Sequence, residues 1–195
     1  MVIREVIGGM ATYCIPAKYI VDNIEVVCEK IDANFSIDKR NDLEVLVIPP
    51  TINTIYDNFW ACNKLVRFDV LKGNNSFKSD CNGVLYSYDK KTLIRVPPAY
   101  SGKYILPHET CAIHSHAFTS CMNISEIILH QKLQVIGVNA FYDCKTQVPI
   151  TIPNTLSRFE GCTNLSTENK HLHFITSFLY KQKEYTYEEI SQLFQ

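Results

Sequence analysis

The pair Phe-x-x-Cys occurs four times in this chain of 195 residues, and that repetition constrains the fold more than any other feature. An apolar residue follows each Cys after three or four positions, and in three of the four units further apolar residues then alternate. Such alternation, rich in β-branched side chains, is typical of a half-buried strand. Each unit is therefore expected to supply one strand. The four pairs are Phe59/Cys62, Phe118/Cys121, Phe141/Cys144 and Phe159/Cys162.

The spacing of the pairs predicts stacked coils of one repeating length. Phe118 and Phe141 are 23 residues apart, a period found in repeat solenoids. Phe59 and Phe118 are 59 residues apart, which is one period plus 36 further residues. The extra residues include GVLYSYDKKTLIRVPP, in which two apolar stretches flank a polar turn, so a β-hairpin insertion is expected at about 74–100. Between Phe141 and Phe159 the separation shrinks to 18, as in a worn repeat near a solenoid end.

The string L-x-x-I-x-I-P…I-G-x-x-A-F-x-x-C-x-x-L, with islands such as GVLYSYDKKTLIRVPP, resembles the BspA-like leucine-rich repeat family of bacterial and protozoan surface antigens. The resemblance covers roughly 41–165 and continues weakly to Tyr187. It departs from the family pattern at His130, where Pro is usual, and at Thr110, an apolar position. It implies an α/β-poor leucine-rich repeat solenoid with one parallel strand per repeat, β-hairpin islands and terminal caps.

The two ends are expected to be caps, at 1–40 and 166–195, because a solenoid exposes its core at both termini. In the first cap, apolar residues recur at steps of four, three and four over 16–31, which predicts an amphipathic helix there. A degenerate strand repeat is the alternative. In the second cap, a hairpin at Leu179 precedes a short predicted helix, with Thr186 and Glu189 spaced as a capping box.

The cysteines of the repeat are predicted to be structural. Cys62, Cys121, Cys144 and Cys162 share one repeat position, whereas a catalytic nucleophile would be needed only once. Burial as small apolar side chains explains four equivalent thiols. Gly137, in the unit VIGVNAFYDC, is expected to turn the chain.

A metal or catalytic site is not expected. Cys111, His114 and His116 lie close in sequence, but no C-x-x-C pair occurs and the two His fall on a predicted connecting turn. The glycines form neither a phosphate loop nor a dinucleotide fingerprint. We therefore expect no catalytic residue, no metal and no cofactor. A remote alternative is a Cys- or metal-dependent hydrolase that brings Cys111 and the two His together in a pocket.

The charge balance disfavours polyanionic partners. The formal net charge is −1, the isoelectric point is about 6.6, and no run of Lys or Arg exceeds two residues. Nucleic-acid binding is thus not expected.

No apolar run of about twenty residues is present, so membrane insertion is not expected either. The first residues lack a signal-peptide pattern, which favours a cytoplasmic location, whereas the family resemblance implies the cell surface.

The outward residues of the strands are the candidate binding surface. Exposed β-branched side chains mixed with single charges of both signs suit a protein or peptide partner. For Val45 and Val47, the alternative is that the N-terminal cap covers them. The aromatic residues Tyr86, Tyr88 and Tyr100 form a second candidate contact. Translation from unit to unit gives one row of Val45, Arg67, Lys103, Glu126 and Pro149, and another of Val47, Asp69, Ile105, Ile128 and Thr151.

Two functions follow as hypotheses. The first is a non-enzymatic protein-binding module, for which the family resemblance implies adhesion or a surface-antigen role. The second is an intracellular scaffold or self-associating repeat protein, in which homo-oligomers form through the solenoid ends.

Overall fold

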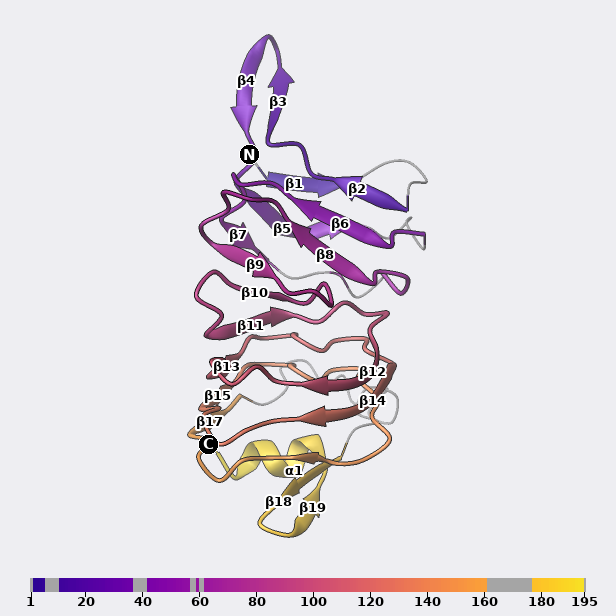
Figure 1. The fold of residues 1–195 in the computed structure, drawn as a ribbon, viewed down its shortest axis with the longest axis vertical. Helices are drawn as coiled ribbons and strands as arrows, with labels where there is room; N and C mark the ends of the chain where they lie inside the picture. Colours follow the sequence, from indigo (N-terminus) through magenta and orange to yellow (C-terminus); the bar gives the residue numbers. More distant parts are fainter. Residues whose placement is uncertain are drawn as a thin grey trace.

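The chain winds into an elongated stack of coils, with its termini toward opposite ends (Figure 1). The computed structural model describes residues 2–5, 11–36, 42–56, 59, 62–160 and 177–194. Nearly all the regular structure is strand, and the helix α1 (Tyr187–Gln192) lies near the C-terminal end. The predicted solenoid is therefore confirmed.

Two walls of strands enclose the core. The first wall contains three sheets, in the orders β2-β6-β8, β12-β14 and β16-β18-β19. Its pairs are parallel except for the terminal hairpin β18–β19. The strands are β2 (Thr12–Cys14), β6 (Val45–Ile48), β8 (Arg67–Val70), β12 (Ser101–Ile105), β14 (Asn123–Ile128), β16 (Ile150–Thr151), β18 (Phe178–Tyr180) and β19 (Lys183–Tyr185).

The second wall carries a further strand for most coils, which the repeat pattern did not predict. It has the sheets β1-β5-β7 and β17-β15-β13-β11-β10-β9. Several of its strands have only two residues, too few for an alternating pattern to be recognised. They are β1 (Val2–Glu5), β5 (Lys30–Ser36), β7 (Thr54–Ile55), β9 (Phe77–Ser79), β10 (Leu85–Ser87), β11 (Thr92–Arg95), β13 (Ala112–Ile113), β15 (Val135–Ile136) and β17 (Arg158–Phe159).

The predicted hairpin insertion at about 74–100 is present. β10 pairs antiparallel with both β9 and β11, and β11 then continues the parallel stack by pairing with β13. The insertion thus extends the second wall by three strands. On the first wall, β8 and β12 belong to different sheets, although the backbone N–H of Ala99 still donates to the carbonyl of Leu65 at 3.0 Å.

The helix predicted over 16–31 is wrong. That stretch holds an antiparallel hairpin of β3 (Lys18–Val21) and β4 (Ile24–Val27), which projects from the N-terminal end in Figure 1. Asp22 and Asn23 have φ of 50° and 62°, and two positive φ values in a two-residue turn favour a tight hairpin. β-branched residues flank the turn and favour strand over helix, which outweighs their helical spacing. Moreover, β2 pairs with β6, so the stack of coils extends into the predicted N-terminal cap.

The described part of the predicted C-terminal cap, 177–194, matches its prediction, and 166–176 lie outside the described residues. β18 and β19 form the hairpin at Leu179, and α1 follows directly. The side chain of Thr186 accepts from the N–H of Glu189 at 3.2 Å, while the Glu189 carboxylate accepts from the N–H of Thr186 at 2.8 Å. These reciprocal bonds form the capping box expected from sequence.

Aromatic side chains of successive coils stack in the core. Phe118 and Phe141, one repeat apart, have ring centroids at 5.0 Å and planes inclined by 16°. Tyr104 meets Phe118 edge-on at 5.2 Å, and Phe141 meets Phe178 in the same way at 5.5 Å. Such pairs stabilise the stack beyond the area they bury. The repeat phenylalanines are therefore packing residues.

The repeat thiols are likewise buried. Cys62, Cys121 and Cys144 have no exposed surface, as predicted, and Cys162 lies outside the described residues. None of the cysteines in the described part of the chain forms a disulfide.

The two departures from the repeat pattern are accommodated by hydrogen bonds. Thr110 is fully buried, and its hydroxyl donates to the carbonyl of Lys90 at 2.9 Å. His130 lies with Nε2 at 2.9 Å from the carbonyl of Pro107, while its Nδ1 accepts from the N–H of Lys132 at 3.1 Å. These two bonds require the Nε2–H tautomer, because one ring nitrogen donates and the other accepts.

Candidate protein-interaction surface

The predicted rows of outward residues fall on three separate sheets: Thr151 lies on β16, which pairs with β18, and Pro149 directly precedes β16. The other eight residues form two parts. On β6 and β8, Val45 is in register with Arg67 and Val47 with Asp69. On β12 and β14, Lys103 is in register with Glu126 and Ile105 with Ile128. Because β8 and β12 lie in different sheets, the two parts do not form one continuous strand surface.

The charges in both parts are neutralised by neighbours. Lys103 Nζ lies 2.9 Å from a Glu126 carboxylate oxygen, directly across the two strands. Arg67 contacts the Asp69 carboxylate through two nitrogens, at 2.6 and 2.7 Å. Exposed ion pairs of this kind add little stability, about 0–1 kcal/mol. Their effect is to leave a surface without a net local charge.

The apolar residues differ in exposure between the two parts. Ile105 is 62% exposed and lies beside half-buried Ile128. Val45 and Val47 are half-buried, and β2 pairs with β6 edge to edge instead of lying over its face. The strand pair β12–β14 therefore presents the more prominent apolar side chain. We call its outward residues Lys103, Ile105, Glu126 and Ile128 the β12–β14 face.

The aromatic candidate is corrected in part. Tyr86 is 1% exposed, so it cannot serve as a contact residue. Its hydroxyl lies 3.0 Å from that of Tyr104 and donates to the Asp80 carboxylate at 3.4 Å. Burial raises the pKa of Tyr104 well above the usual 10.0, and burial likewise raises the pKa of Tyr86. This pair therefore ties β10 to β12 as neutral phenols.

The other two tyrosines keep some exposure. Tyr100 is half-buried, and its hydroxyl donates to the carbonyl of Lys103 at 3.2 Å. Tyr88 is 45% exposed and lines a surface hollow.

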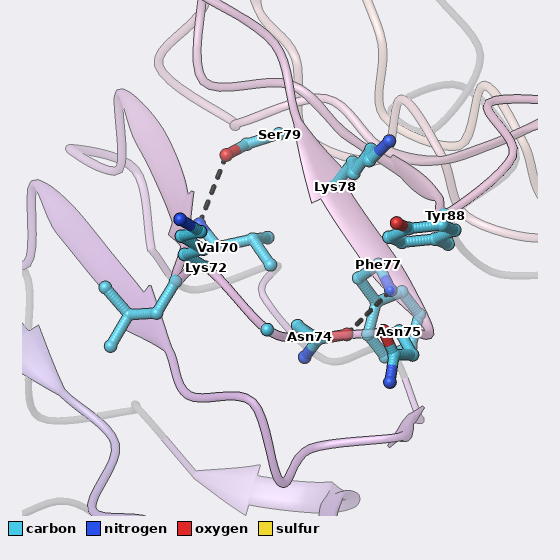
Figure 2. A pocket seen from close by; sticks show the side chains of 10 residues that line it. Val70, Lys72, Asn74, Asn75, Phe77, Lys78, Ser79 and Tyr88 are labelled. Atoms are coloured by element: carbon cyan, nitrogen blue, oxygen red, sulfur yellow. Dashed lines mark hydrogen bonds between the residues drawn. The ribbon is translucent and has the colours of Figure 1, made fainter.

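The hollow, of about 340 Å³, was not predicted from sequence. Residues from the end of β8, the following turn, β9 and Tyr88 surround it (Figure 2). The polar residues that line it lie close together in sequence, within 72–79, but they match no motif, so no sequence pattern indicated a hollow. They include Lys72, Asn74, Asn75, Lys78 and Ser79.

The Cys–His candidate does not assemble into a site. His114 is exposed, whereas Cys111 is half-buried, with its sulfur 3.6 Å from the carbonyl of Lys91. His116 Nδ1 instead lies 3.3 Å from the Thr119 hydroxyl. Within the described ranges, no three His, Cys, Asp or Glu side chains are arranged to hold a metal ion.

The same part of the chain contains no helix long and apolar enough to cross a bilayer.

Comparison with known proteins identifies the repeat. A model of the BspA type leucine-rich repeat region matches residues 102–193 in six copies. A leucine-rich repeat protein from Eubacterium ventriosum has a similar crystal structure, with a TM-score of 0.61 and 22% identity over 69% of this chain and 36% of that one. This likeness supports the fold alone.

A second solved structure is closer in sequence. The pneumococcal vaccine antigen PcpA is 34% identical over 60% of this chain and 29% of that one, with a TM-score of 0.55. This chain thus spans about a third of the length of the two solved chains. No curated protein matches the sequence.

Proposed function

Because residues 102–193 are leucine-rich repeats of the BspA type, we propose that this chain is a non-enzymatic protein-binding module that uses the β12–β14 face. One observation carries the proposal. Ile105 is 62% exposed beside Ile128, and the charges next to them, Lys103 and Glu126, neutralise each other. An apolar centre with a neutralised polar rim resembles protein interfaces more than it resembles a site for a polyanion.

The finer role that we propose is adhesion at a cell surface. The support is the likeness to PcpA, which is described as a vaccine antigen, and the repeat type itself. This step is an analogy from relatives and not a consequence of the geometry.

The test replaces both isoleucines by glutamate and measures partner capture. Immobilised wild-type chain is incubated with matrix proteins and cell extract, and captured proteins are identified by mass spectrometry. The Ile105→Glu/Ile128→Glu variant should lose the partner, because a buried unpaired carboxylate in an interface is costly. Leu193→Glu is the matched control, since Leu193 is 51% exposed in the C-terminal cap. Undiminished capture by the double variant would exclude this face as the site.

A self-associating repeat protein is the second candidate. The observation in its favour is the hairpin β3–β4, on which Ile20 is 78% and Ile24 is 66% exposed at the N-terminal end. A two-stranded hairpin with such side chains in water is only marginally stable without packing partners. Light scattering should then show a dimer that the Ile20→Lys/Ile24→Lys variant loses. A wild-type chain that stays monomeric at high concentration rules this candidate out.

A further inference from the structure

The hollow beside β9 has walls that hydrogen bonds fix in place. Asn74, 4% exposed, donates its amide to the carbonyls of Pro49 and Ile52, both at 2.9 Å. Its carbonyl oxygen accepts from the N–H groups of Ser76 and Phe77 at 2.8 Å. All the polar atoms of this amide are thus engaged in shaping the turn after β8. The hollow is preformed, which lowers the entropic cost of binding.

A further hydrogen bond joins the two strands that border the hollow. The Ser79 hydroxyl on β9 accepts from the N–H of Val70 on β8 at 3.1 Å (Figure 2). The last residue of β8 is thereby held against β9, the first strand of the insertion.

Two lysines give the hollow a positive charge that its own lining does not neutralise. Figure 2 shows Lys72 and Val70 on one side, and Lys78 and Tyr88 on the other. No Asp or Glu lines the hollow. Among the described residues, no carboxylate lies within ion-pair distance of Lys72 or Lys78. By contrast, the lysine and arginine on the neighbouring strand faces, Lys103 and Arg67, are paired.

The carboxylates nearest in sequence to the lining residues bind partners outside the hollow. Asp69 binds Arg67, and Asp89 accepts from the Ser87 hydroxyl and the N–H of Lys91. Asp80 accepts from the N–H groups of Asn82 and Val84. The positive charge of the hollow is therefore available to a ligand.

The ammonium of Lys78 is also held in position. It lies 4.1 Å from the centroid of the Tyr88 ring, within the range of a cation–π contact. This contact restrains a long flexible side chain at the rim. Beside Lys72, the exposed side chain of Leu71 offers an apolar surface, 47% exposed.

We propose that this hollow binds an acidic residue of an extended peptide segment, with an apolar residue of the same segment against Leu71. The carboxylate lies between the ammonium groups of Lys72 and Lys78. The hollow opens to solvent, so it admits a side chain that projects from a partner. The site is separate from the β12–β14 face and does not depend on it.

The test selects peptides from a displayed random heptapeptide library on the full chain. The same selection is made on Lys72→Gln/Lys78→Gln and on the control Lys132→Gln/Lys145→Gln, in which two other exposed lysines are changed. Wild type and control should enrich peptides in which Asp or Glu neighbours an apolar residue, and the Lys72/Lys78 variant should not. The most enriched peptide is then synthesised with its acid and with the matching amide.

Fluorescence anisotropy of the labelled peptides measures the affinities. We expect a loss of about tenfold or more when either the acid or the two lysines are neutralised, because charge-assisted hydrogen bonds are lost. Lys72→Arg/Lys78→Arg should restore binding, and Ile105→Glu/Ile128→Glu should leave it unchanged. Equal binding by the amide peptide, unchanged binding by the Lys72/Lys78 variant, or a selection without acidic peptides would overturn the proposal.

Discussion

At the scale of single residues, buried Arg95 replaces backbone donors that its coil lacks. In the two coils that follow, turn N–H groups of one coil bond turn carbonyls of the next: Phe118 to Ala140 at 2.7 Å and Ser120 to Tyr142 at 3.1 Å. The coil before them carries Pro97 and Pro98, which have no N–H. The Arg95 guanidinium, on a residue only 1% exposed, instead donates to the carbonyls of His116 and Thr119, both at 2.7 Å.

Arg95→Leu should therefore destabilise the fold through its loss of donors. It leaves the carbonyls of His116 and Thr119 without the guanidinium, and we expect the free energy of unfolding to fall by roughly 1–3 kcal/mol. Urea unfolding followed by circular dichroism measures the change. Lys91→Leu, an exposed position on the same hairpin, is the control and should stay within about 0.5 kcal/mol of wild type. A variant as stable as the control would contradict this role.

Gly137 is required for close packing and not, as the sequence suggested, for turning the chain. Its φ is outside the left-handed region, which is occupied instead by Asn139 and Asp143 and, one repeat earlier, by His116 and Ser120. A Cβ at position 137 would lie 2.5 Å from the backbone nitrogen of Ser115 in the preceding coil. The contact is with backbone, so relief requires the coils to separate.

Gly137→Ala should consequently lower the free energy of unfolding by about 1–3 kcal/mol, the range for overpacked sites. The transition midpoint in urea gives the value. Gln134→Ala, an exposed side chain in the same coil, should change it by less than about 0.5 kcal/mol. If alanine is accepted at 137 without loss, the two coils can move apart easily.

At the scale of elements, the two terminal hairpins share one turn geometry with different residues. In β3–β4 the turn is Asp22-Asn23, and in β18–β19 it is Lys181-Gln182, with φ of 48° and 66°. Asn and Asp tolerate positive φ, whereas Lys and Gln rarely adopt it. The second turn is thus held by its surroundings: Tyr180, directly before it, packs against Phe194 with ring centroids 5.4 Å apart, and Phe178 on the same strand is fully buried.

Lys181→Asn/Gln182→Gly should stabilise the C-terminal hairpin by about 1 kcal/mol, since both residues suit a turn with two positive φ values. Slower amide hydrogen exchange in β18 and β19 would report it, with β12 and β14 as the unaffected reference. Faster exchange in this hairpin would show that the original side chains make a contact that outweighs the strain.

The pair of tyrosines that links β10 to β12 makes stability depend on pH. Burial raises the pKa of Tyr104 above the usual 10.0, so the unfolded chain loses this proton at lower pH than the folded one. The stabilisation from the neutral phenol is complete below about pH 10 and falls as pH rises beyond it. Tyr104→Phe should flatten that decline in urea midpoints between about pH 8 and pH 11. Tyr88→Phe is the control, and a decline that is unchanged in Tyr104→Phe would assign the dependence to other groups.

The sequence predicted the strands that follow the repeated Phe-x-x-Cys pairs, and it missed elements that depend on two-residue strands or on a single turn. The strands around Ile127 and Ile150 were found because the Phe-x-x-Cys pairs place them, and β13 and β15 were missed because two residues carry no periodicity. The hairpin β3–β4 was misread because Ile20, Ile24 and Val27 fit a helix by spacing, whereas the Asp22-Asn23 turn decides the structure. The outward residues were predicted by translation, but the hollow was not, since it depends on how a turn packs against an insertion.

At the scale of the whole molecule, the core consists of two clusters that meet at the insertion. One runs from Ile15 to Leu85 and the other from Val84 to Ile190. In solenoids each coil contacts mainly its neighbours, so stability is close to a sum of local terms. A substitution that destabilises one cluster should therefore lower the stability of the other cluster less.

The substitution Phe118→Leu tests whether the two core clusters unfold independently of each other. It removes the stacking of Phe118 on Phe141 and its edge contact with Tyr104, and we expect a cost of roughly 1–2 kcal/mol. Hydrogen exchange should rise in β13, β15 and β17 while β6 and β8 keep most of their protection. Uniform loss of protection over both clusters would mean that the chain unfolds as one cooperative unit.

The in-register pairing of β12 with β14 suggests how the stack could gain a further coil. Lys103 pairs with Glu126 and Ile105 with Ile128 across 23 residues, so a copy of one such segment would fit between its neighbours without altering either end. Each added coil would raise the stack by about 4.8 Å, the spacing of adjacent strands. Insertion of such segments would therefore lengthen the first wall in fixed increments.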